Sequence, residues 1–125
     1  MNTRVGEIKK NQKESLLRKE IGVLLQETSL DYPELNGVSV SRVELSSDKG
    51  LARVFFFLPE GKDAFEQKLQ TLKLFRKSLR KALATRIPGR YVPQIMFHYD
   101  DQLEKQIKIE TLLDKVKKID DNTET

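Results

Sequence analysis

The chain has 125 residues, with 23 Lys and Arg against 19 Asp and Glu and a formal net charge of +4. This length predicts a single domain with its own hydrophobic core, and the absence of cysteine excludes disulfide frameworks, thiolate metal sites and cysteine nucleophiles. No apolar stretch approaches the roughly 20 residues that cross a bilayer, and the first residues do not resemble a signal peptide, so we expect a cytoplasmic protein without membrane contact.

The first predicted element is a helix whose apolar side repeats at steps of three and four residues. The residues of this side are Leu17, Ile21, Leu24, Leu25 and Thr28. We expect the helix to end near Thr28, because residues 29–37 include proline, asparagine and glycine, which favour turns. Residues 1–14 form a basic N-terminal arm that is either a helical extension or mobile.

A β-hairpin is predicted next, from apolar residues that alternate along the chain. The phase of that alternation slips by one residue at Ser41 and Arg42, which indicates a β-bulge. After a polar turn, the nearly continuous apolar run at residues 51–58 is typical of a central strand. Within this run we expect Val54 and Phe56 to face the helices.

A second long helix is predicted from Ala64 to about Ile87, with Asp63 as its N-cap. Its apolar stripe comprises Phe65, Leu69, Leu72, Phe75, Leu79, Ala82 and Leu83. Because the pattern is longer than an average helix, we expect a kink or break between Thr71 and Leu74.

This helix also carries the clearest indication of a partner, because no acidic residue occurs between Gln67 and Tyr99. Residues 62–99 carry +7 of formal charge and the rest of the chain −3, so the basicity is local. A concentrated positive field attracts polyanions, of which nucleic acid is the commonest. The RNA-binding residues that we predict are Lys68, Lys73, Arg76, Lys77, Arg80, Lys81, Arg86 and Arg90.

The remaining elements are a third strand and a last helix. Pro88 and Gly89 end the long helix, and the strand at Gln94–Tyr99 alternates apolar and polar residues. The apolar residues that indicate the last helix are Leu103, Ile107, Leu112, Leu113, Val116 and Ile119. We therefore expect one domain at residues 15–119, followed by a polar tail at residues 120–125.

The polar residues form no pattern typical of an enzyme. His98 is the only histidine and has no evident metal-ligand partner in the sequence, which favours a structural or surface role. Asp100 and Asp101 follow a strand, and we interpret them as a turn and the N-cap of the last helix instead of a catalytic pair. The glycines are scattered and form no phosphate-binding loop. We therefore expect no cofactor, no metal and no small-molecule substrate.

The predicted order helix, strand, strand, helix, helix, strand is that of the type II KH fold, an α+β domain whose three-stranded sheet is covered by helices on one face. Here a C-terminal helix follows. Five segments carry a resemblance in addition to this order: LLRKEIGVLLQE (16–27), VSVSRVELSSDKGLARVFF (38–56), FRKSLRKALATRI (75–87), VPQIMFHYDD (92–101) and KIETLLDKV (108–116). Together they resemble the ribosome-binding factor A family.

The resemblance implies a non-enzymatic assembly factor of the bacterial small (30S) ribosomal subunit. Such a factor binds immature subunits and their 16S rRNA and assists late maturation of the 5′ end of that rRNA. We expect a monomer that recognises RNA by its shape and backbone.

Two points remain open at the level of sequence. The family has an Ala-x-Gly interruption between its central helices, where many KH domains have G-x-x-G, whereas Thr71, Leu72 and Lys73 occupy that place here. The basic helix is also compatible with an adaptor that binds an acidic protein without contacting RNA.

Overall fold

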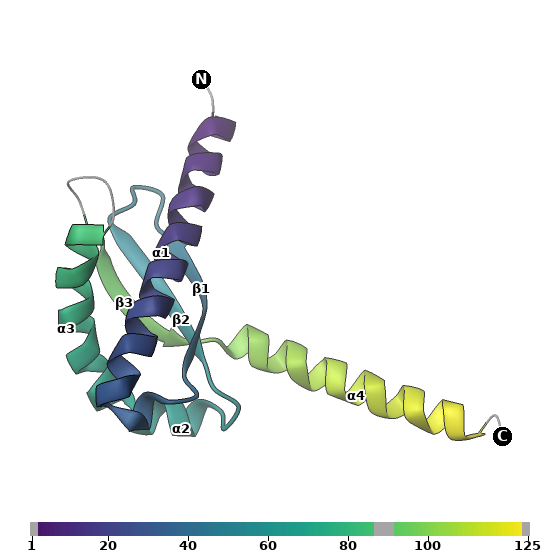
Figure 1. Ribbon diagram of the computed structural model, residues 1–125. Helices are drawn as coiled ribbons and strands as arrows, with labels where there is room; N and C mark the ends of the chain where they lie inside the picture. The colour runs from purple at the N-terminus through teal and green to yellow at the C-terminus, as the bar shows by residue number, and fades with distance from the viewer. Residues whose placement is uncertain (1–2, 87–91, 124–125) are drawn as a thin grey trace.

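The computed structural model describes residues 3–86 and 92–123, with side chains for residues 6–86 and 92–119. Its elements are helix α1 (Thr3–Asp31), the short 3-10 helix η1 (Pro33–Leu35), strands β1 (Ser39–Leu45) and β2 (Leu51–Phe57), helices α2 (Lys62–Gln67) and α3 (Leu69–Arg86), strand β3 (Gln94–Tyr99) and helix α4 (Asp101–Thr123) (Figure 1). The α+β class and the element order expected from the sequence are confirmed.

The three strands form one mixed sheet in the order β1-β2-β3. Strand β2 pairs antiparallel with β1 and parallel with β3, so the apolar run is the central strand, as predicted. The register between β1 and β2 shifts between Val40 and Arg42, which confirms the bulge at Ser41. Val54 and Phe56 are both fully buried, because alternate residues of β2 face the helices.

Helices α1 and α3 lie over the same face of the sheet (Figure 1). Between these helices and the sheet, Phe56 is the centre of an aromatic cluster, with ring centroids 6.0 Å from Phe65 of α2 and 4.8 Å from Phe97 of β3. The helices contribute Leu17, Ile21, Leu24, Leu25, Leu72, Phe75, Leu79 and Leu83 to this core. This packing fixes the position of α3 over the sheet.

The break in the second long helix lies at Lys68, between α2 and α3, and not between Thr71 and Leu74 as predicted. Contacts distant in sequence hold it there. The Lys68 ammonium donates a hydrogen bond to the carbonyl oxygen of Glu34 in η1, and the Thr71 hydroxyl donates to the Glu34 carboxylate at 2.7 Å. These bonds stabilise the bend without a glycine or proline.

The predicted N-cap at Asp63 is wrong. Helix α2 begins at Lys62, two residues before the predicted start at Ala64, and Gly61 is its N-cap without a side-chain hydrogen bond. Gly61 has φ 95° and ψ −174°, a conformation open mainly to glycine. Asp63 lies instead in the first turn of α2, where its charge complements the helix dipole.

Helices α1 and α4 are both longer than the sequence pattern indicated. Helix α1 begins at Thr3 and ends at Asp31, so it includes residues 3–14, for which a helical extension was one of the two expectations. Helix α4 starts at Asp101 and projects away from the rest of the domain (Figure 1). The predicted helix end at Pro88 and Gly89 lies outside the described residues.

Candidate nucleic-acid interface

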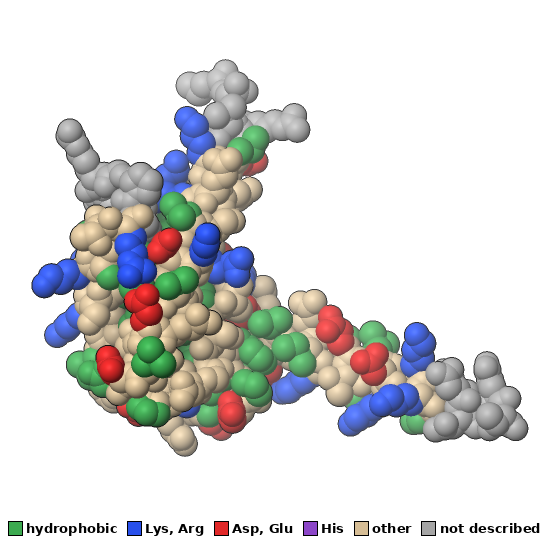
Figure 2. All heavy atoms as spheres, viewed as in Figure 1, with side chains coloured by type: hydrophobic (Ala, Val, Ile, Leu, Met, Phe, Trp, Pro, Cys, Tyr) green, Lys and Arg blue, Asp and Glu red, His purple; other side chains and the backbone are tan. Residues whose placement is uncertain are grey.

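Four cations on α3, Lys73, Arg76, Lys77 and Arg80, form what we call the α3 stripe. All four are exposed, and Figure 2 shows Lys and Arg side chains projecting from the α3 side of the domain. The buried face of the same helix carries Leu72, Phe75, Leu79 and Leu83. Because the stripe repeats at steps of three and four residues, its side chains lie along one side of the helix, next to the buried face.

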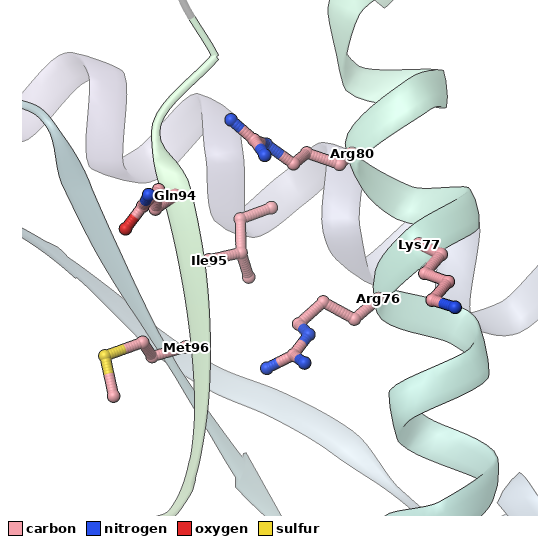
Figure 3. A pocket seen from close by; sticks show the side chains of 6 residues that line it. All are labelled: Arg76, Lys77, Arg80, Gln94, Ile95 and Met96. Atoms are coloured by element: carbon pink, nitrogen blue, oxygen red, sulfur yellow. The ribbon is translucent and has the colours of Figure 1, made fainter.

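Three of the four residues of the α3 stripe form one wall of an open groove of about 380 Å³ between α3 and β3, and Lys73 does not line it. Arg76, Lys77 and Arg80 line it from the helix, and Gln94, Ile95 and Met96 line it from the strand. Arg76 and Arg80 extend from α3 toward β3, and the Ile95 side chain points toward the helix (Figure 3). The guanidinium groups of Arg76 and Arg80 therefore lie near the apolar side chain of Ile95 (Figure 3).

Strand β3 is an edge strand in the described sheet, because it pairs with β2 alone. The backbone N–H and C=O groups of its outer edge are therefore available to a ligand that lies in the groove. Met96 is 45% exposed and Gln94 is also exposed, whereas Ile95 is buried. The groove thus combines charge, hydrogen-bonding groups and an apolar surface.

The sequence predicted the α3 stripe but not the strand residues of the groove. The alternation in Gln94–Tyr99 identifies a strand, but it does not show which edge of that strand stays unpaired. The type II KH order contains that information, because it places the last strand beside the central one.

The charge of the groove is not neutralised within the described residues, where no carboxylate lies within 4.0 Å of the charged groups of Arg76, Lys77 or Arg80. Like charges at these spacings destabilise an isolated helix by a few tenths of a kcal/mol per pair. A bound polyanion would remove this repulsion, so the groove favours an anionic ligand.

Among the residues that the structure describes, the other predicted RNA-binding residues do not line the groove. Lys81 is exposed on α3 but does not line it, and Lys68 is hydrogen-bonded to η1. The Arg86 guanidinium lies 3.7 Å from the Glu20 carboxylate and 3.5 Å from the Glu27 carboxylate, so it connects the end of α3 to α1. Arg90 lies outside the described residues.

Asp100 is the N-cap of α4, as interpreted from the sequence. Its Oδ1 accepts a hydrogen bond from the Leu103 amide at 3.0 Å, and its Oδ2 accepts from the Ser41 hydroxyl at 2.7 Å and from Arg42 Nε at 3.2 Å. Burial acts to raise the pKa of Asp100, but the hydrogen bonds from Ser41 and Leu103 and the charge of Arg42 outweigh it and lower that pKa. The side chain is thus an ionised structural group.

His98 packs against other planar groups on the sheet. Its ring stacks on Phe55 at 5.4 Å between centroids, and the Arg42 guanidinium lies 3.9 Å from the Phe55 centroid on the neighbouring strand. Within the part of the chain that the structure describes, no three His, Cys, Asp or Glu side chains are placed to hold a metal ion. Among the same described residues, no helix has the length and hydropathy to span a membrane.

Comparisons with known proteins agree on one family. The model of the family "Ribosome-binding factor A" matches residues 9–113. A ribosome-binding factor A of Chromohalobacter salexigens is 36% identical over 101 residues, which cover 79% of this chain and 76% of that protein. One from Halothermothrix orenii is 34% identical over 102 residues, covering 82% and 83%. The crystal structure of ribosome-binding factor A from Thermus thermophilus superposes with a TM-score of 0.60 at 26% identity, covering 72% of this chain and 94% of that one.

Proposed function

The chain belongs to the ribosome-binding factor A family, and on that premise we propose that it is a cytoplasmic assembly factor that binds the immature small ribosomal subunit. It contacts 16S rRNA and assists late maturation of the 5′ end of that rRNA. The groove between α3 and β3 is the surface that meets the RNA.

The observation that carries this proposal is the set of three cations, Arg76, Lys77 and Arg80, along the open edge of β3. Guanidinium and ammonium groups bind phosphate oxygens, and arginine does so with two parallel hydrogen bonds. Folded rRNA presents phosphates and ribose hydroxyls more readily than base edges. The groove therefore recognises the backbone of the RNA and its shape.

The proposed mechanism is binding without covalent catalysis. The groove is lined by Arg, Lys, Gln, Ile and Met side chains, which do not supply a nucleophile next to a general base. By binding the rRNA, the protein holds a maturing segment of that RNA in one conformation until processing is complete. A monomer is sufficient for this role.

Co-sedimentation with purified ribosomal subunits tests the proposal. At low salt the protein should pellet with small subunits and not with large ones, and high salt should release it, because phosphate contacts are screened. Cells that lack the gene should accumulate precursor 16S rRNA and free subunits, most strongly in the cold. Failure to pellet with small subunits at low salt would refute the proposal.

Ribonuclease treatment separates this function from the adaptor alternative, in which an acidic protein occupies the groove. Complexes formed through rRNA dissociate when the RNA is digested. A complex that survives digestion would favour the adaptor.

A further inference from the structure

Helix α4 carries large apolar side chains that nothing in the described structure covers. Ile109, Leu112, Leu113, Val116 and Ile119 are 55–62% exposed. None of them belongs to the described core, and α4 projects away from the sheet and its helices (Figure 1). Contiguous exposed apolar surface of this kind marks an interaction site in soluble proteins.

The spacing of these residues is that of a helix-pairing seam. Ile109, Leu112, Val116 and Ile119 follow one another at steps of three, four and three, which is the a and d pattern of a heptad repeat. Leu113 lies beside this row. We call these five residues the α4 seam. The family match ends at residue 113, so Val116 and Ile119 lie beyond it.

The direction of α4 is fixed at its first turn. Asp100 caps the helix through the Leu103 amide and is held by Ser41 and Arg42 of the β1 bulge. The Asp100 amide also donates to the Phe56 carbonyl in the central strand at 2.8 Å. These contacts hold the start of α4 against the sheet. The α4 seam therefore belongs to a helix that is anchored to the domain at its first turn.

Lysines mark one border of the α4 seam. Lys108 and Lys115 are seven residues apart on the same side, and Lys115 follows Leu112 by three residues. All three are exposed. On the other side of the seam the charges are mixed, with Glu110 and Lys117. A partner therefore gains most from an acidic residue facing Lys108 or Lys115.

We propose that the α4 seam binds an amphipathic helix of another protein, one whose apolar row is bordered by acidic residues. Isoleucine, leucine and valine at heptad spacing pack against the same spacing on a second helix, and the flanking charges select the partner and its orientation. This site is separate from the groove between α3 and β3 and does not depend on the function proposed for that groove.

A second copy of the chain is a poorer occupant. Parallel pairing would place the two copies of Lys105 face to face, because Lys105 continues the seam four residues before Ile109. Antiparallel pairing would place the two lysine borders against each other. Charge therefore favours a different, acidic helix over a second copy.

Two synthetic helical peptides test the proposal with the full chain. Each has about 21 residues with Ile and Leu at the heptad positions; one has Glu at the flanking positions and the other has Lys. Titration calorimetry should give an affinity at least about tenfold higher for the Glu peptide than for the Lys peptide. Exchanging the border charges, Lys108→Glu with Lys115→Glu, should reverse that preference.

Two controls are a double variant within the α4 seam and the affinity of that variant for small ribosomal subunits. Leu112→Gln with Val116→Gln should abolish binding of both peptides while leaving the circular dichroism spectrum and the affinity for small subunits unchanged, since both side chains are exposed.

Four results would overturn the inference. They are equal affinity for the two peptides, no binding of either one, self-association of the chain that the Gln variant abolishes, and a loss of subunit affinity in the Lys108→Glu, Lys115→Glu variant, which would identify RNA as the occupant. Subunit binding by the unchanged chain is measured separately, so the two proposals fail independently.

Discussion

Replacing Asp100 with asparagine isolates the charge that joins α4 to the sheet. Asparagine caps helices as well as aspartate does, so the bond to the Leu103 amide is retained. The change removes the negative charge from a carboxylate that accepts hydrogen bonds from the Ser41 hydroxyl at 2.7 Å and from Arg42 Nε at 3.2 Å. The Asp100 side chain is 4% exposed. Arg42 keeps its ion pair with Glu44.

Hydrogen bonds to charged groups contribute about 1.5–3 kcal/mol each. Because asparagine can still accept one bond and Arg42 keeps one partner, we expect the free energy of unfolding to fall by about 1–3 kcal/mol. Asp114→Asn is the matched control. Asp114 is exposed on α4, and its replacement should change the free energy of unfolding by no more than about 0.5 kcal/mol.

The free energy of unfolding should depend on pH in a direction set by the Asp100 carboxylate. The pKa of Asp100 is lowered in the folded protein, so the carboxylate stabilises the fold above its unfolded pKa of about 3.9. This stabilisation is lost as the pH falls through the folded pKa. Urea unfolding at about pH 7, 5 and 3 should therefore show a difference between the unchanged protein and Asp100→Asn that shrinks at the lowest pH. A difference below about 0.5 kcal/mol at pH 7, or one that does not change with pH, would refute the reasoning.

Three further changes test the fold and the site. Phe56→Ala should lower the free energy of unfolding by about 3–5 kcal/mol, because Phe56 is fully buried; a loss below about 1 kcal/mol would show that the face assignment of β2 is inverted. Gly61→Ala should cost about 1–3 kcal/mol, because φ is 95° there, and a neutral result in urea unfolding would contradict this. Arg86→Ala, which breaks ion pairs with Glu20 and Glu27, should cost at most about 1 kcal/mol and weaken subunit binding less than Arg76→Ala does in the same pelleting assay.

Local patterns in the sequence predicted most of the fold. Alternation of apolar residues identified β1 and β3, a nearly continuous apolar run identified β2, and the phase slip at Ser41 and Arg42 located the bulge. These features depend on neighbouring residues and are readable in one dimension. The break at Lys68 was misplaced because the side chains of Lys68 and Thr71 donate hydrogen bonds there to Glu34, a residue far away in sequence.

Only part of the candidate site was predicted, because contacts between residues distant in sequence complete it. The α3 stripe follows from spacing on one helix, whereas Gln94 and Met96 join it only because β3 is an edge strand. Helical spacing also cannot show that Arg86 turns toward α1, since its carboxylate partners belong to another helix. A single sequence does not show which residues of different helices and strands contact one another.

The salt dependence of small-subunit binding tests most directly whether the groove between α3 and β3 contacts rRNA. Each phosphate contact that is removed lowers the slope of log affinity against log salt by about 0.7–0.9. Arg76→Ala with Arg80→Ala should therefore lower the magnitude of that slope by about 1.4–1.8 with thermal stability unchanged or slightly raised. The charge-matched control, Lys117→Ala with Lys118→Ala on α4, should leave the slope as it is. If the α3 variant binds small subunits with unaltered affinity and slope, or if both variants change the slope equally, the groove is not the RNA-binding surface.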